Sequence, residues 1–112
     1  MRSFTAYAGR MTTARRLRPI AQLQCKGGPC ELSPASMQCY NKGWDGKTVN
    51  WDCRADLDQR VRFGGVHVVC EGYDYAGDQY ILAGSCGVGN ICIRSSYINF
   101  LMEELLKGVT TH

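Results

Sequence analysis

The strongest structural pattern of the chain lies in residues 37–54, which read M-Q-C-Y-N-K-G-W-D-G-K-T-V-N-W-D-C-R. In the second half of this segment apolar and polar residues alternate strictly, and the apolar positions are Val49, Trp51 and Cys53. Alternation with a period of two is typical of a β-strand that is buried on one face. Asp45-Gly46 is a preferred two-residue hairpin turn, because both residue types tolerate a positive φ. We therefore predict a β-hairpin in which Cys39 and Cys53 lie nearly opposite each other, in diagonal positions.

Three further stretches predict short strands. Residues 17–25 form an extended stretch in which Pro19 disfavours a helix, and residues 79–86 are a second candidate. The third, residues 60–70, loses its alternation at Gly64-Gly65, where one extra residue, a bulge, would return the apolar residues to one face: Val61, Phe63, Val66, Val68 and Cys70. Four to six short strands with glycine-rich turns indicate an all-β fold, a small sheet or sandwich. Residues 95–108 predict a short amphipathic helix that stops at a glycine.

The composition restricts the class of protein. The chain has 112 residues, of which 45% are hydrophobic and 21% charged, with a formal net charge of +3. This length fits one domain, and the balance is too apolar for a disordered chain and too weakly charged for a dedicated nucleic-acid binder. No apolar run approaches the ~20 residues of a membrane-spanning helix, so we expect no span in this chain. We interpret the basic cluster at residues 10–18 as a solvated face, with binding of phosphate or acidic lipid as the alternative.

Seven cysteines are the most unusual feature of the sequence. Zinc sites prefer closely spaced cysteines, but this chain has no C-x-x-C pair, and its histidines are His67 and His112. The wider spacings fit cysteines on separate strands, so we predict a disulfide framework whose pairing stays open, with one thiol left over. Oxidised cysteines imply the secretory pathway, yet the start of the chain lacks the apolar segment of a signal peptide. We therefore interpret the chain as a mature portion or a fragment.

We find no motif for catalysis, a cofactor or a metal. The acidic loops between Asp45 and Asp78 lack the spacing of an EF-hand, and loose calcium binding is the alternative that they leave open. A Cys–His nucleophile would have to use His67, which lies among valines and is better explained as a strand residue. The glycine-rich residues 84–90 lack the Lys-Ser/Thr of a P-loop. An enzyme that uses Cys92 or His67 is therefore the weakest hypothesis.

Aromatic residues in predicted turns are the candidates for a contact surface. Tryptophan and tyrosine are enriched at protein interfaces, because each combines a large apolar ring with a polar group. Trp51 lies in a predicted strand and is assigned to the core, whereas Trp44 lies at the hairpin turn. We predict an interaction surface that comprises Trp44, Asp45, Tyr73 and Tyr75.

Three stretches also resemble a known family in their order and spacing: residues 11–25, residues 38–58 and residues 68–87. The most specific run is N-K-G-W-D-G, which W-D-C and D-L-D follow. From about Arg2 to Gly87 the chain resembles the lumenal domain of the store-operated calcium entry-associated regulatory factor (SARAF) family.

The resemblance implies a non-enzymatic regulator without a cofactor. Family members are single-pass proteins of the endoplasmic reticulum membrane, with a cysteine-bridged, β-rich domain on the lumenal side and a cytosolic tail. They damp store-operated calcium entry and associate with the stromal interaction molecule, which senses lumenal calcium. The cysteines at the family's positions are candidates for disulfides: Cys25, Cys30, Cys39, Cys53, Cys70 and Cys86. Cys92 lies outside the shared pattern.

We divide the chain into a SARAF-like lumenal β domain, residues 1–87, and a divergent, partly helical tail, residues 88–112. The family's signal peptide, membrane helix and cytosolic tail have no match here, so we expect a truncated or alternative form. The other hypothesis is a soluble, secreted, disulfide-rich domain that binds a protein or glycan through Trp44 and the tyrosines. Exposed strand edges make a homodimer a further alternative.

Overall fold

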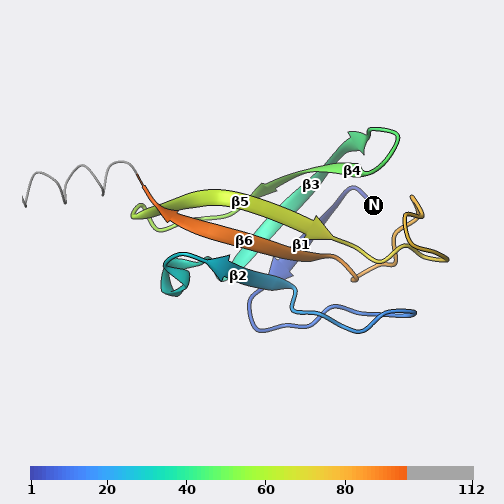
Figure 1. Ribbon diagram of the computed structural model, residues 1–112, viewed down its shortest axis with the longest axis horizontal. Coiled ribbons are helices and arrows are strands. Elements are labelled where there is room, and N and C mark those ends of the chain that lie inside the picture. The colour runs from blue at the N-terminus through green and yellow to red at the C-terminus, as the bar shows by residue number, and fades with distance from the viewer. Residues whose placement is uncertain (96–112) are drawn as a thin grey trace, which may run out of the picture.

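The computed structural model describes residues 1–95 and contains two three-stranded sheets (Figure 1). The elements are β1 (Ser3–Tyr7), β2 (Leu23–Gly27), the 3-10 turn η1 (Cys30–Leu32), β3 (Ser36–Trp44), β4 (Val49–Arg54), β5 (Val61–Val69) and β6 (Gly87–Arg94). One sheet has the order β1-β3-β4 and the other the order β2-β6-β5. The predicted all-β fold is confirmed. The helix predicted over residues 95–108 lies, from residue 96 onward, outside the described residues.

The β3–β4 hairpin forms as predicted, but its register differs from the prediction. The turn comprises residues 45–48 instead of two residues, and a backbone hydrogen bond of 3.0 Å joins its ends. A bulge between Asn41 and Trp44 then shifts β3 relative to β4. The longer turn and the bulge together bring Cys39 directly opposite Cys53. The predicted diagonal placement is therefore wrong.

The second sheet is built around β6, which pairs antiparallel with β5 and parallel with β2. The register of β5 shifts between Phe63 and Gly65, so the predicted bulge at the glycines is confirmed. It allows Val61 to be buried while Phe63 and Val68 pack against the core. Val66 lies in the open gap between the sheets and stays partly exposed.

Two of the predicted strands need correction, and β1 was not predicted. Residues 79–86 form no strand, because their backbone groups pair within the loop that connects β5 to β6; Leu82 N–H, for example, donates to the Glu71 carbonyl. The final strand begins only at Gly87 and includes residues that we had assigned to the tail. Of residues 17–25, only those from Leu23 onward join a sheet, since the preceding residues pair back on residues 10–12.

The hydrophobic core lies between the two sheets and is small. Its buried members come from four strands: Ala6, Leu23, Met37, Cys39 and Val88. Trp51 packs against this cluster and meets Phe4 edge to face, with ring centroids 5.0 Å apart, which agrees with its assignment to the core. Asn90 is 1% exposed, and within residues 1–95 its side-chain amide has no hydrogen-bond partner, which is a cost to stability.

The six cysteines that the resemblance marks as disulfide candidates form three disulfides. The bridges are Cys25–Cys30, Cys39–Cys53 and Cys70–Cys86. The first closes the turn after β2, the second joins β3 to β4 inside the core, and the third closes the long loop between β5 and β6. Cys92 is free and buried.

The Cys39–Cys53 bridge should contribute more to stability than the Cys25–Cys30 bridge. It closes a longer stretch of chain, with a sequence separation of 14 against 5, and its Cys39 end is fully buried. Loop-closure entropy predicts that Cys39→Ala with Cys53→Ala lowers the free energy of unfolding by about 3 kcal/mol, and Cys25→Ala with Cys30→Ala by about 2 kcal/mol. Urea unfolding of both variants at pH 7 tests this order. Equal unfolding midpoints for the two variants would contradict it.

Candidate interaction surface

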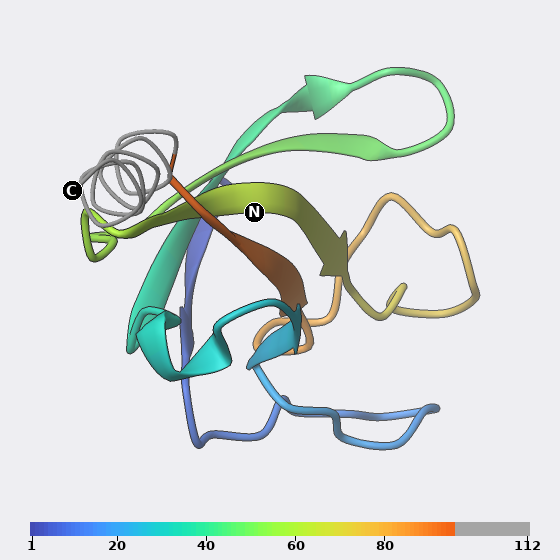
Figure 2. The same ribbon diagram turned by 60° about the vertical axis from the view of Figure 1, so that its left-hand side comes forward.

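Three loops gather at one end of the molecule. They are residues 10–20, the hairpin turn 45–48 and residues 71–85, and Figures 1 and 2 both place them at the right-hand end. All four residues of the predicted interaction surface belong to this end. Trp44 and Asp45 come from the hairpin, and Tyr73 and Tyr75 from the loop between β5 and β6.

Trp44 borders a hollow between the hairpin and the opposing loop. The hollow has a volume of about 120 Å³, and Trp44 and Thr48 line it from the hairpin while Gly72 and Ile81 line it from the loop. Trp44 is 44% exposed although it lines this hollow, so the residue is partly covered and partly open to solvent. This is the placement of a ring that can gain burial when a partner docks.

The Asp45 side chain stabilises the hairpin turn through hydrogen bonds to its backbone. Its Oδ1 accepts hydrogen bonds from the backbone N–H groups of Lys47 and Thr48, each at 2.9 Å. The Thr48 N–H, followed by that of Lys47, lowers the pKa of Asp45 below its ordinary value. The carboxylate shapes the loop next to Trp44, and a direct contact with a partner stays a prediction.

The two tyrosines differ in how firmly they are held. The guanidinium of Arg15 lies 4.5 Å from the centroid of the Tyr73 ring, and its Nη1 donates to the Tyr73 carbonyl at 3.2 Å. A cation over an aromatic face restrains the ring. Tyr75 is 62% exposed, and nearby Tyr80 is more exposed still. The loop therefore presents one fixed ring and two freer ones.

The buried carboxylate of Glu71 joins the loop of residues 71–85 to the loop of residues 10–20. The sequence analysis did not identify this residue. Glu71 is 4% exposed, and it accepts hydrogen bonds from the backbone N–H groups of Arg15, Arg16 and Leu17 at 2.9–3.3 Å. The Arg16 N–H is the largest of the effects that hold the pKa of Glu71 below its ordinary value, although burial acts in the opposite direction. The Arg16 side chain also donates to the Gly72 carbonyl at 2.7 Å. Only tertiary structure brings these segments together, so no local motif could have revealed the contact.

The residues considered for nucleophilic chemistry do not meet. His67 is exposed on β5, opposite Gly89, whereas Cys92 is buried on β6, opposite Phe63 of the core side. Within residues 1–95, no group of three or more histidine, cysteine or acidic side chains is placed to hold a metal ion.

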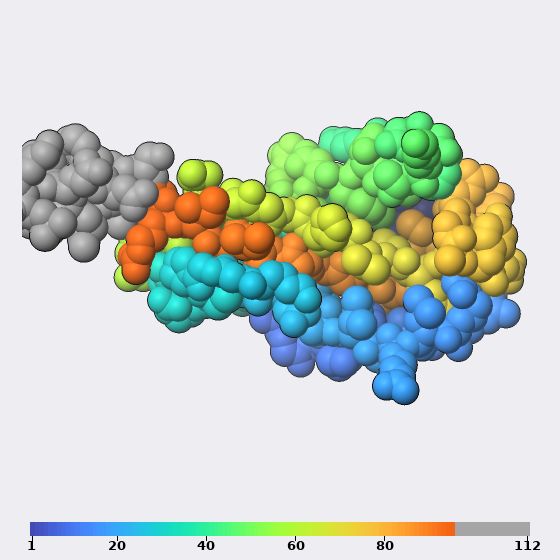
Figure 3. Space-filling view, viewed as in Figure 1, coloured from blue at the N-terminus to red at the C-terminus, as the bar shows by residue number. Residues whose placement is uncertain are grey.

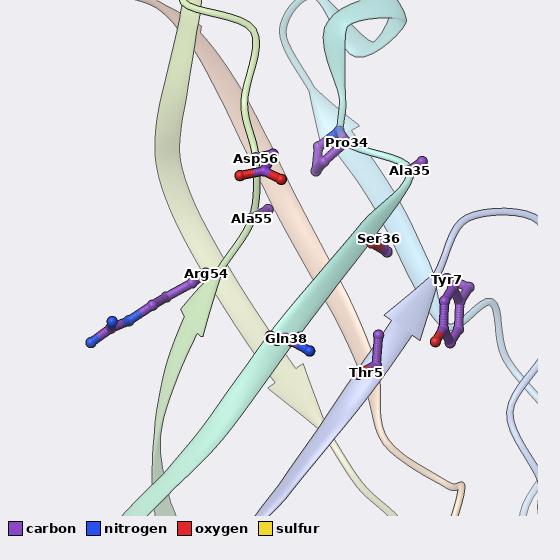
Figure 4. Close-up of a pocket in the computed structure, with 9 residues that line it drawn as sticks. All are labelled: Thr5, Tyr7, Pro34, Ala35, Ser36, Gln38, Arg54, Ala55 and Asp56. Carbon is purple, nitrogen blue, oxygen red and sulfur yellow. The ribbon is translucent and has the colours of Figure 1, made fainter.

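A larger hollow lies on the outer face of the β1-β3-β4 sheet (Figure 4). Its volume is about 580 Å³, within the range of small-molecule sites. It is lined by Thr5, Tyr7, Pro34, Ala35, Ser36, Gln38, Arg54, Ala55 and Asp56. The lining offers hydroxyl, amide and charged groups without the arrangement of a nucleophile and a base. Sequence reasoning missed it because β1, which supplies one wall, was not predicted.

These features define a class of protein: a small β domain, crosslinked by disulfides, whose functional candidates are surfaces for contact. The comparisons with known proteins agree. A family model described as SOCE-associated regulatory factor of calcium homoeostasis (SARAF) matches residues 1–92. The chain belongs to the SARAF family.

Curated relatives named store-operated calcium entry-associated regulatory factor match most of the chain. The protein of Rattus norvegicus is 54% identical over 89 residues, which are 77% of this chain and 27% of the relative. For Xenopus tropicalis the identity is 48% over 91 residues, 79% of this chain and 28% of the relative. For Danio rerio it is 52% over 87 residues, 75% of this chain and 25% of the relative.

The chain thus spans roughly a quarter of the length of the curated relatives that it matches. Residues 1–95 contain no helix that could span a lipid bilayer.

The Glu71 contact predicts an acid-sensitive contribution to stability. Because folding lowers the pKa of this carboxyl, its contribution is complete above its ordinary pKa of 4.5 and is lost as the pH falls through the lower folded value. Glu71→Gln should lower the urea midpoint at pH 7, and its difference from the wild type should shrink below about pH 4.5. The exposed Glu31→Gln is the matched control and should leave the midpoint unchanged. If the urea midpoint of Glu71→Gln lies below that of the wild type by the same amount at pH 7 and at pH 3, this role is contradicted.

Proposed function

We propose that this chain is a non-enzymatic module of a negative regulator of store-operated calcium entry, and that it works on the lumenal side of the endoplasmic reticulum. The observation that carries the proposal is the family match over residues 1–92, together with identities near 50% to proteins named for this process. The disulfides suit an oxidising compartment such as the endoplasmic reticulum lumen.

The proposed partner is the stromal interaction molecule, and the proposed contact is the loop end of the domain. There Trp44, at the end of β3, is 44% exposed, and Tyr75, on the loop that the Cys70–Cys86 bridge closes, is 62% exposed. Rigid aromatic side chains lose little conformational entropy on binding and are frequent anchors of interfaces. Restraint of calcium entry would then depend on a protein–protein contact rather than on catalysis.

A chimera tests this function. The matching segment of the Rattus norvegicus relative is replaced by residues 1–92 of this chain, and calcium influx after store depletion is measured in cells. We expect the chimera to damp influx as the relative does, and Trp44→Ala with Tyr75→Ala to reduce the damping. Tyr40→Ala, which removes an exposed ring of β3 four residues before Trp44, is the matched control. A folded chimera that leaves influx unrestrained would sink the proposal.

The second candidate function is a secreted domain that binds a protein or glycan. The hollow of Figure 4 favours it, because Thr5, Ser36 and Asp56 line that hollow and, within residues 1–95, their side chains form no hydrogen bond or ion pair. A glycan panel tests this function. Binding of a glycan that is lost in Asp56→Asn and Ser36→Ala but is unchanged in Trp44→Ala would favour this function over the first.

A homodimer is a further proposal. β1 and β4 are the edges of one sheet, and β2 and β5 are the edges of the other, so each offers unpaired backbone groups. Sedimentation equilibrium of the oxidised chain measures the oligomeric state directly.

A further inference from the structure

One edge of each sheet faces the other along one side of the molecule. β4 is an edge strand of the β1-β3-β4 sheet and β5 an edge strand of the β2-β6-β5 sheet, and Figures 1 and 2 both show the two strands side by side. They are not hydrogen-bonded to each other. A hollow of about 220 Å³ lies between them, with Trp51 and Cys53 of β4 on one wall and Val66 and Val68 of β5 on the other. The two edges are therefore the walls of a groove.

The backbone of β5 directs polar groups into this groove. Val68 lies opposite Val88 of β6, but the Val88 N–H donates to the Gln22 carbonyl, on the β2 side, at 2.8 Å. Opposite residues of an antiparallel pair either exchange both of their hydrogen bonds or exchange none, so Val68 makes none with Val88. Because this pattern alternates along a strand, Val66 has the same orientation. The N–H and C=O groups of both valines therefore point away from β6.

The edge of β4 has the same property. Trp51 lies opposite Asn41 of β3, whose N–H donates to the Arg2 carbonyl, on the β1 side, at 2.8 Å. By the same rule, the N–H and C=O groups of Trp51, and of Cys53 two positions further along, point away from β3. Within residues 1–95, no backbone hydrogen bond from outside the sheets reaches these residues or the two valines. Both walls of the groove thus present donors and acceptors that lack a partner strand.

The side chains along the groove are mainly apolar. A second hollow, of about 120 Å³, shares Val49, Trp51 and Val68 with the first and continues it to Trp44. In the space-filling view of Figure 3, the surface is hollowed between the green hairpin and the gold loop that connects β5 to β6. Trp51 and Val68 pack against the core cluster. Since side chains alternate along a strand, every second side chain of an extended occupant would meet this apolar lining.

The two edges define the kind of occupant that the groove fits. Buried backbone groups need hydrogen-bond partners, and a helix offers none along its length, because its N–H and C=O groups bond to each other. A single extended segment does, since successive residues direct these groups to opposite sides and can pair with both walls. Each strand of residues 1–95 already has a neighbour in its sheet, so a folded second copy has no strand that is free on both sides. The fitting occupant is therefore an extended segment of a different protein.

Length and charge restrict the occupant further. β4 has 6 residues, which extend about 20 Å at ~3.3 Å per residue, so a segment of about seven residues would span the groove. Lys47 lines the Trp44 end and forms no ion pair within residues 1–95. Asp78, at the same end, already accepts hydrogen bonds from the Asp74 and Tyr80 N–H groups at 3.1 and 3.0 Å. A carboxylate at this end of the segment would therefore complement the ammonium group of Lys47.

We propose that the groove between β4 and β5 binds an extended segment of another protein, apolar at alternate positions and acidic at the end near Lys47. The segment would hydrogen-bond to Trp51 and Cys53 of β4 on one side and to the two valines of β5 on the other. It would thereby join the two three-stranded sheets into one. This inference does not depend on the function proposed above, because it rests on the backbone of the two edges.

Amide NMR of the full, oxidised chain tests the proposal with synthetic peptides. The probes are acetylated and amidated heptapeptides E-X-T-X-T-X-E, in which X is Val, Ile, Leu or Phe; an acid at both ends allows either strand direction. We expect at least one probe to shift the amide resonances of both walls, at Trp51, Cys53, Val66 and Val68, and to slow their hydrogen exchange several-fold. The same peptide with its X residues N-methylated keeps the side chains but loses the donors toward one wall, and should bind about tenfold more weakly.

Two substitutions in β5 are a matched pair. Val66→Lys places a charge in the groove and should weaken binding of the probe about tenfold, since a lysine that points inward at an edge opposes the addition of a strand. Val69→Lys, on the same strand, changes a residue that lines hollows outside the groove and should leave the affinity unchanged. Val66 is 38% exposed and Val69 53%, so both positions can accommodate the longer side chain.

Three results would overturn the proposal. The first is shifts that are confined to one wall, which would indicate addition to a single edge. The second is slow exchange of these amides before any probe is added: if it depends on protein concentration, a second copy fills the groove, and if it does not, the chain fills the groove itself. The third is a spectrum in which none of the probes, at millimolar concentration, moves the resonances of either wall.

Discussion

The Cys39–Cys53 bridge joins neighbouring strands of one sheet at the point where the other sheet packs onto it. Within residues 1–95, Cys39 is fully buried in a cluster of five buried residues. So small a buried cluster contributes little hydrophobic stabilisation, so covalent constraints on the unfolded chain supply a larger share of the stability. The turn length and the bulge in β3 are what make this bridge possible, because they set the register that places the two cysteines opposite each other.

The other two bridges, unlike this one, organise loops. Cys70–Cys86 closes the long connection between β5 and β6, and the Glu71 carboxylate next to it holds the arginine-containing loop through three backbone N–H groups. Tyr73 and Tyr75 thus lie on a loop whose ends are crosslinked, at the same end of the molecule as Trp44 of the hairpin. A surface of this kind suits recognition, and it agrees with membership in a family of regulatory factors.

The two outer faces of the sandwich differ in chemistry. The β1-β3-β4 face carries a polar hollow, whereas the β2-β6-β5 face carries aliphatic side chains over a glycine floor. β6 is the central strand of the second of these sheets, and the family match ends within it, at residue 92.

The sequence alone determined the local features of this protein. Strict alternation predicted the β3–β4 hairpin, the paired glycines predicted the bulge in β5, and the cysteine count predicted a crosslinked all-β domain. Each of these depends on side-chain periodicity or on residue types within a few positions. The specific run around N-K-G-W-D-G was sufficient for the family.

Only the tertiary structure decided the register, the parallel pairing of β2 with β6 and the Glu71 contact. Residues 79–86 show why: their composition suits a strand, but a strand needs an edge to pair with, and here the loop closed by Cys70–Cys86 satisfies its own backbone. Glu71 lies more than fifty positions from the N–H groups that it binds. No periodicity encodes such a distance, because the partners of a buried polar group are chosen by the packing of the whole chain.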